Sequence, residues 1–126
     1  MQKIRVTSLH FAFALAASPA FADCADLAAE EAKVAAAKNC GEAYKIYEAC
    51  LWGSTADVQR GGTVQEICEK GFLSTLSAAR KKRYDREIAR CEKEYRNEDG
   101  TMYRSMEAVC AAGTARDFWK KFGEKR

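Results

Sequence analysis

Histidine is almost absent from this chain: the only one among the 126 residues is His10. Its side chain supplies many general bases and metal ligands because its ordinary pKa lies near neutrality. Its absence after residue 10 disfavours Ser-His and Cys-His nucleophile pairs. Phosphate-loop, nucleophile-elbow and calcium-loop motifs are also missing. We therefore expect neither an enzyme nor a protein that holds a metal or another cofactor.

Proline is equally scarce, with Pro19 as the single example. Beyond it, only glycine and local capping can end a helix. No run of alternating β-branched residues predicts a strand. The sequence therefore predicts an all-α fold, a small disulfide-stapled bundle of about four to five helices.

No apolar run is long enough to cross a membrane. The longest, Val6 to Ala17, is about a dozen residues, whereas a spanning helix needs roughly 20. Lys3 and Arg5 precede this run, and Pro19 with an Ala-x-Ala motif follows it. This order is typical of a secretory signal peptide, here residues 1–22, which is removed by cleavage.

Two alternatives to simple cleavage concern the same segment. A retained anchor is disfavoured by the short apolar run. A lipid on Cys24 is disfavoured because Asp23 stands where lipoprotein processing needs a small residue. We therefore expect no stable membrane anchor. We also expect that the protein is bacterial and that it is located in the periplasm or the extracellular medium.

Residues 23–126 form one predicted domain, helical and rich in cysteine, without an internal repeat or a low-complexity linker. Lys3 and Arg5 belong to the signal peptide, so this domain carries 19 basic and 18 acidic residues. Nucleic-acid-binding domains usually have a strong basic excess. We therefore expect no nucleic-acid partner.

The six cysteines all follow the signal peptide and predict three disulfides in an oxidising compartment. Zinc is disfavoured because nine residues separate the closest pair, Cys40 and Cys50, and zinc sites usually use C-x2-C pairs. The cysteines are Cys24, Cys40, Cys50, Cys68, Cys91 and Cys110.

We favour the pairs Cys50–Cys68 and Cys91–Cys110, since each is placed symmetrically about a predicted turn. Cys24–Cys40 would then remain. Sixteen residues of unbroken helix span about 24 Å, far more than the roughly 7 Å allowed between bridged Cα atoms. Either the chain bends back before Cys40 or a pairing is wrong, and the connectivity stays open.

Helix boundaries can be placed from capping residues and glycines. Residues 25–50 are strongly helix-forming, as one helix or as two with Asn39 and Glu42 as a capping box. Residues 52–62 predict a loop, and Thr63 with Glu66 predicts the next helix start. The most regular periodicity covers residues 77–97. Two further helices are expected on either side of Gly113.

Three residues are candidate contacts with a partner: Trp52, Arg60 and Trp119. Arg60 lies in the predicted loop before a helix N-terminus, where free N–H groups favour anions. The two tryptophans are candidates as exposed aromatics, although aromatics at helical spacing often belong to a core. The sequence favours binding over catalysis, as an inhibitor or modulator of another exported protein or hydrolase. The alternative is a structural or stress-protective periplasmic protein without a dedicated ligand.

Overall fold

A computed structural model describes residues 24–123, and within this range the chain forms five α-helices, one 3-10 turn and no strand. The elements are α1 (Leu27–Ala35), α2 (Cys40–Ala49), α3 (Thr55–Lys70), η1 (Leu73–Thr75), α4 (Ala78–Tyr95) and α5 (Thr101–Phe122). The all-α prediction is confirmed for this part of the chain. The predicted signal peptide, residues 1–22, lies outside the described residues.

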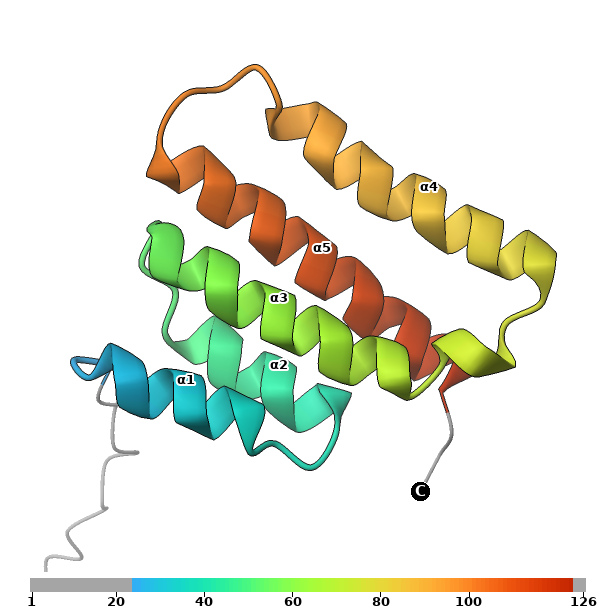
Figure 1. Cartoon of the computed structure of the whole chain (residues 1–126), viewed down its shortest axis with the longest axis horizontal. Coiled ribbons are helices and arrows are strands. Elements are labelled where there is room, and N and C mark those ends of the chain that lie inside the picture. The colour runs from blue at the N-terminus through green and yellow to red at the C-terminus, as the bar shows by residue number, and fades with distance from the viewer. Residues whose placement is uncertain (1–23, 124–126) are drawn as a thin grey trace, which may run out of the picture.

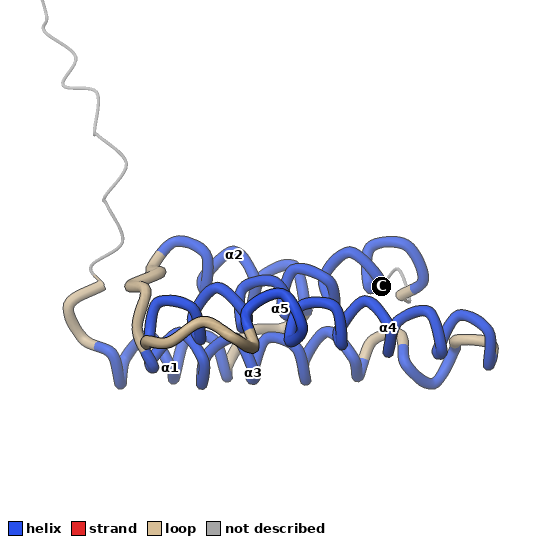
Figure 2. The backbone as a smooth tube through the Cα atoms, turned by 90° about the horizontal axis from the view of Figure 1, so that it is seen from above, coloured by secondary structure: helices blue, strands red, loops and turns tan. Residues whose placement is uncertain are grey.

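The helices lie roughly alongside one another, with α4 at one edge of the bundle and α1 and α2 toward the other (Figure 1). Viewed after a rotation of 90°, the bundle is seen to be flat (Figure 2). The most extensive packing joins α3 to α5, and α4 packs mainly against α5. One end of the bundle therefore gathers the loop between α2 and α3, the loop between α4 and α5, and Cys24.

Residues 25–50 form two helices, which settles a question that the sequence leaves open. Helix α1 ends at Ala35, and the side chain of Asn39 then accepts a hydrogen bond of 3.0 Å from the Glu42 N–H. The Glu42 carboxylate accepts in return from the Lys38 N–H at 2.8 Å. These bonds satisfy amides that a helix start leaves unpaired, so the chain turns back here.

Helix α3 begins earlier than predicted. The expected loop 52–62 is wrong, because α3 starts at Thr55 with a capping box between Ser54 and Asp57. Thr63, the predicted cap, donates its hydroxyl to the Gln59 carbonyl at 3.2 Å, as threonines inside helices do.

Glycines inside α3 and α5 are the reason that the helix boundaries predicted from the sequence differ from those in the structure. A Cβ at Gly61 would lie 2.8 Å from Tyr47 Oη and 3.1 Å from the Ala108 Cβ. Glycine is needed there because α2 and α5 approach α3 closely, not because the chain turns. Gly113 is likewise inside α5, so the predicted break at Gly113 is wrong. The helix predicted for residues 77–97 is confirmed as α4, capped by Ser77.

The core runs through all five α-helices. At the end of the bundle where α3 stops, Phe72, Tyr84 and Phe118 form an aromatic cluster with ring centroids 5.0–6.0 Å apart. Such edge-to-face and tilted pairs add to the stabilisation from burial alone. None of the described helices is long and apolar enough to span a membrane.

The three disulfides are Cys24–Cys50, Cys40–Cys68 and Cys91–Cys110. The Cys91–Cys110 prediction is confirmed, and it joins the antiparallel helices α4 and α5. The Cys50–Cys68 prediction and the remaining pair Cys24–Cys40 are wrong. Because α1 folds back on α2, Cys24 reaches the end of α2, and Cys40 at its start faces Cys68 on α3. The first two bridges are therefore interlaced along the chain.

Candidate functional site

Asp57 organises the loop between α2 and α3. Its buried carboxylate accepts hydrogen bonds from the N–H groups of Trp52 at 3.0 Å, Gly53 at 2.6 Å and Ser54 at 3.2 Å. Ser105 of α5 donates its hydroxyl to the same carboxylate at 2.7 Å. One side chain of α3 thus fixes three consecutive loop amides and a neighbouring helix.

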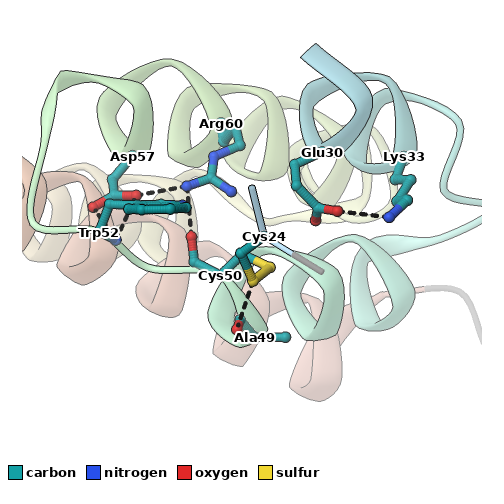
Figure 3. Close-up of a disulfide and its surroundings, with 8 residues drawn as sticks. All are labelled: Cys24, Glu30, Lys33, Ala49, Cys50, Trp52, Asp57 and Arg60. Carbon is teal, nitrogen blue, oxygen red and sulfur yellow. Dashed lines mark hydrogen bonds and ion pairs between the residues drawn. A yellow bond between two sulfur atoms is a disulfide. The ribbon is translucent and has the colours of Figure 1, made fainter. Parts of the chain in front are cut away.

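Arg60, one turn along α3, completes this network. Its Nη2 donates to Asp57 Oδ1 at 2.7 Å and to the Cys50 carbonyl at 2.6 Å (Figure 3). The Tyr47 hydroxyl donates to the Asp57 carbonyl at 3.1 Å. A buried ion pair is tolerated when further hydrogen bonds satisfy its atoms. Asp57 meets that condition, whereas Nη1 of Arg60 is buried with no hydrogen-bond partner among the described residues.

The network shifts two pKa values in opposite directions. Burial by itself raises the pKa of Asp57, but hydrogen bonds from Ser105 and from the amides of Ser54, Trp52 and Gly53 outweigh it, and the pKa lies below its ordinary value. Hydrogen bonds to the charged form have this effect. Burial, followed by the nearby Asp57 charge, raises the pKa of the Tyr47 hydroxyl. Asp57 is therefore ionised and Tyr47 neutral at neutral pH.

Two disulfides flank this loop. Cys50, directly before Leu51, is bonded to Cys24, and the two Cα atoms are 5.5 Å apart (Figure 3). On the other side, Cys110 of α5 is bonded to Cys91 of α4. The chain segments beside the loop are thus held covalently as well as by hydrogen bonds.

Four large apolar side chains are exposed on this braced end, and we call them the apolar patch. They are Leu51 (43 % exposed), Trp52 (52 %), Met102 (53 %) and Met106 (42 %). A Cβ at Gly53 would meet Met102 Cγ at 3.8 Å, so the loop lies directly against the start of α5. Grouped exposed apolar side chains often mark an interaction site, whereas single ones are ordinary.

A hollow of about 360 Å³ opens beside the patch. Its lining is mostly apolar and comes from the loop, α4 and α5: Leu51, Tyr95, Ser105, Met106, Val109 and Cys110. Ser105, which lines the hollow, is the residue that binds Asp57. The hollow is therefore shaped by the same network that holds the loop.

Acidic residues lie next to the patch, in the loop between α4 and α5. Glu98 and Asp99 are exposed and have no ion pair among residues 24–123. Arg104 is occupied elsewhere, because it donates to the carbonyls of Tyr95 and Glu98 and pairs with Glu107 at 2.8 Å. We call Glu98 and Asp99 the acidic rim.

A second hollow, of about 490 Å³, lies at the other end of the bundle. Its lining residues are Glu66, Glu69, Lys70, Leu73, Ser74 and Lys81. Glu69 already accepts hydrogen bonds from Tyr84 at 2.6 Å and Gln65 at 2.8 Å. The carboxylate is committed to holding α4 against α3, so this hollow is the weaker candidate.

The three predicted contact residues have different surroundings. Trp52 lies exposed in the apolar patch, and its role in partner binding stays a prediction. Arg60 was wrongly predicted to face a partner: only 1 % of it is exposed, because α3 begins before it and turns it inward. Trp119 is half-buried, and a Cβ added at Gly71 would lie 2.7 Å from its ring. Its ring packs against the end of α3, outside the candidate site.

The sequence carries signals for the other site residues as well. Ser54-x-x-Asp57 fits the capping-box pattern, and it would have placed both the helix start and the central carboxylate. Leu51, Met102 and Met106 follow helical apolar spacing, which is typical of residues that face a core. Periodicity shows that side chains share a face, and it does not show whether another helix covers that face.

Among residues 24–123 there is no free thiol and no side-chain cluster that could hold a metal ion. All six cysteines are in disulfides, and no three His, Cys, Asp or Glu side chains between residues 24 and 123 gather into a metal site. What the arrangement offers is a braced apolar surface beside acidic side chains. The chain matches no protein-family model and has no significant match to a curated protein or a solved structure.

Proposed function

We propose that this protein is an exported bacterial binding protein that recognises another protein through the apolar patch. The observation that carries the proposal is the exposure of Leu51, Trp52, Met102 and Met106 together on a part of the molecule held by the Asp57 network. Tryptophan is enriched among the residues that dominate binding energies at interfaces. Trp52 is the central contact in this proposal.

Rigidity supports this function. Binding is weakened by the entropy lost when loops and side chains become ordered. Here three loop amides are bound to one carboxylate, and Cys50 is bridged to Cys24. A loop ordered in advance loses little freedom on binding, which is the property that suits an inhibitor or modulator of an exported protein such as a hydrolase.

Charge next to the patch indicates the chemistry of the partner. Glu98 and Asp99 have no cation paired with them in the described chain, so a partner with lysine or arginine around an apolar centre would complement them. The hollow lined by Leu51 and Met106 could receive an apolar side chain of that partner.

Export is part of the proposal. Three disulfides form and persist in oxidising compartments, and residues 1–22 have the sequence pattern of a signal peptide. The periplasm and the extracellular medium are the compartments where such a protein would meet its partner.

The test is a binding experiment with matched variants. Protein with intact disulfides would be used to capture partners from the exported protein fraction, and the affinity of each captured protein would be measured. Trp52→Ala should weaken binding at least about 30-fold, as expected for a residue worth about 2 kcal/mol or more. Leu76→Ala, a partly exposed leucine at the opposite end of the bundle that lines neither hollow, is the control and should bind like the unmodified protein.

Two results would contradict the proposal. One is a partner that binds the Trp52→Ala variant as tightly as the unmodified protein. The other is the absence of any stoichiometric partner, together with a loss of stress resistance when the gene is deleted. That second result would favour the structural or stress-protective role.

A further inference from the structure

The outer face of α4 carries a row of cations. Tyr84 and Cys91 are buried against the bundle, and a helix turns by about 100° per residue, so the residues opposite them face away from it. We call four of these the basic ridge, all of them exposed: Lys82, Arg86, Arg90 and Lys93. Figure 1 shows α4 at the edge of the molecule, with α5 on one side only.

The acidic residues of α4 lie on the flanks of this ridge. Counted from Tyr84 at about 100° per residue, Asp85 and Glu92 fall on one flank, and Glu87 and Glu94 on the other. Only Arg90 of the ridge is paired, with Glu87 at 3.1 Å. The other three cations have no ion pair among residues 24–123. Arg83 falls on the flank with Glu87 and Glu94. The charges of the sequence are mixed, but the helix sorts them by face.

The fold does not require these cations. Only Lys93, in the last turn of α4, is placed where a positive side chain complements the helix dipole. The side chains are exposed and most are unpaired, so their burial or pairing does not stabilise the bundle. An anionic ligand outside the molecule would account for them.

We propose that the basic ridge adsorbs the protein onto an anionic lipid surface, with the phosphate groups of the lipids as its ligands. From Lys82 to Lys93 the ridge is about 16 Å long at about 1.5 Å per residue. Mobile headgroups can gather beside each cation of such a straight row, and clustered lysines and arginines are attracted to anionic membranes.

A lipid surface fits the ridge better than an acidic protein does. Protein interfaces have a core of apolar and aromatic side chains, and the only apolar residue along the ridge is Ala89. The ridge also shares no residue with the apolar patch. A membrane could therefore hold α4 while Leu51, Trp52, Met102 and Met106 remain free for a partner protein.

The test is co-sedimentation of the disulfide-bonded protein with vesicles at low ionic strength. One set of vesicles contains phosphatidylglycerol mixed with phosphatidylcholine, and the other contains phosphatidylcholine alone. Binding should occur only to the first set and should weaken as salt is raised, because salt screens exposed charges.

Variants with equal net charge separate the ridge from general attraction. The triple variant Lys82→Gln, Arg86→Gln, Lys93→Gln should lower the affinity about 100-fold, since each cation near the surface contributes about a five-fold change. The control, Lys38→Gln, Lys45→Gln, Lys120→Gln, removes three exposed charges elsewhere and should lower it far less. Circular dichroism verifies that both variants are folded.

Four results would overturn the proposal. They are no binding to anionic vesicles at low salt, equal binding to both vesicle types, and equal losses in the two triple variants. The fourth is binding of soluble polyglutamate as tight as that of the vesicles, which would indicate an acidic protein as the natural ligand.

Discussion

The loop between α2 and α3 and the helix α4 are both at the surface, and they are held in opposite ways. The loop is short, yet it is fixed by Asp57, Arg60 and the Cys24–Cys50 bridge. Helix α4 has 18 residues, of which only Tyr84 and Cys91 are buried, and it packs mainly on α5. Regular secondary structure is therefore no guide to which region is the more rigid.

The difference also separates two kinds of surface. The loop presents the apolar patch in a fixed shape, which suits selective recognition of one partner. The outer face of α4 presents cations that need no fixed geometry to interact with an anionic surface. The predictions below test whether the two regions differ as strongly as the structure indicates.

The largest effect is expected from Asp57→Ala. The change removes the partner of a buried arginine and three loop hydrogen bonds, and it should lower the free energy of unfolding by about 3–5 kcal/mol. Asp26→Ala is the control, because Asp26 also caps a helix but is exposed, and its loss should be about 1 kcal/mol. Urea unfolding monitored by circular dichroism measures both. Equal losses would show that the buried network does not stabilise the loop.

Removing one disulfide at a time should show which helices each disulfide stabilises. Cys40→Ala with Cys68→Ala should lower the free energy of unfolding by about 2–5 kcal/mol and should destabilise α1 to α3 together. Cys91→Ala with Cys110→Ala should loosen α4 more than the other helices, because Tyr84 is then the only buried side chain that anchors it. Hydrogen exchange of the amides of residues 78–95 provides the measurement. If hydrogen exchange in the Cys91→Ala, Cys110→Ala variant were accelerated equally over the whole chain, the contrast between the loop and α4 would be contradicted.

Adjacent glycines of α3 offer a smaller, sharper test. Gly61→Ala should be destabilising by about 1–3 kcal/mol, because its Cβ would meet Tyr47 and Ala108. A Cβ at Gly62 would meet nothing within 4 Å, so Gly62→Ala should be stabilising by about 0.5–1 kcal/mol. If both variants shifted the thermal unfolding midpoint in the same direction, the close packing of α2 and α5 around Gly61 would be refuted.

The smallest effect is the pH dependence of the loop. Because the pKa of folded Asp57 lies below its ordinary value, the unfolded chain binds more protons in acid, and stability falls as the pH decreases through the folded pKa. The stability difference between the unmodified protein and Asp57→Asn should be constant above about pH 5 and should shrink below about pH 4. A difference that persists undiminished at about pH 2 would be inconsistent with this linkage.

Local features of the fold were predictable from the sequence. Tyr84, Ile88, Cys91 and Tyr95 have the spacing of one helical face, and α4 follows it. Asn39 is a strong N-cap residue, and α2 begins directly after it. Cys91 and Cys110 pair because they lie on neighbouring antiparallel helices joined by a short loop. Each of these depends on a single helix or on two helices joined directly by a short loop.

Features that depend on how the helices pack against one another were not predictable in the same way. Gly61 permits close packing by α2 and α5, whereas local rules associate glycine with turns. The pairing of Cys24 with Cys50 requires α1 to fold back along α2. The burial of Arg60 depends on the Cys50 carbonyl, ten residues earlier in the chain. Tertiary contacts decided all three.

The most direct test of the central claim, that a braced loop presents the apolar patch, is native-state hydrogen exchange at the amides of Trp52 and Gly53. Both lie in a surface loop outside any helix, so without the Asp57 network they would exchange rapidly. The account predicts strong protection in the unmodified protein, exceeding that of amides near the C-terminal end of α4, and its loss in Asp57→Ala. Exchange of both amides at the rate of an unstructured loop would contradict it.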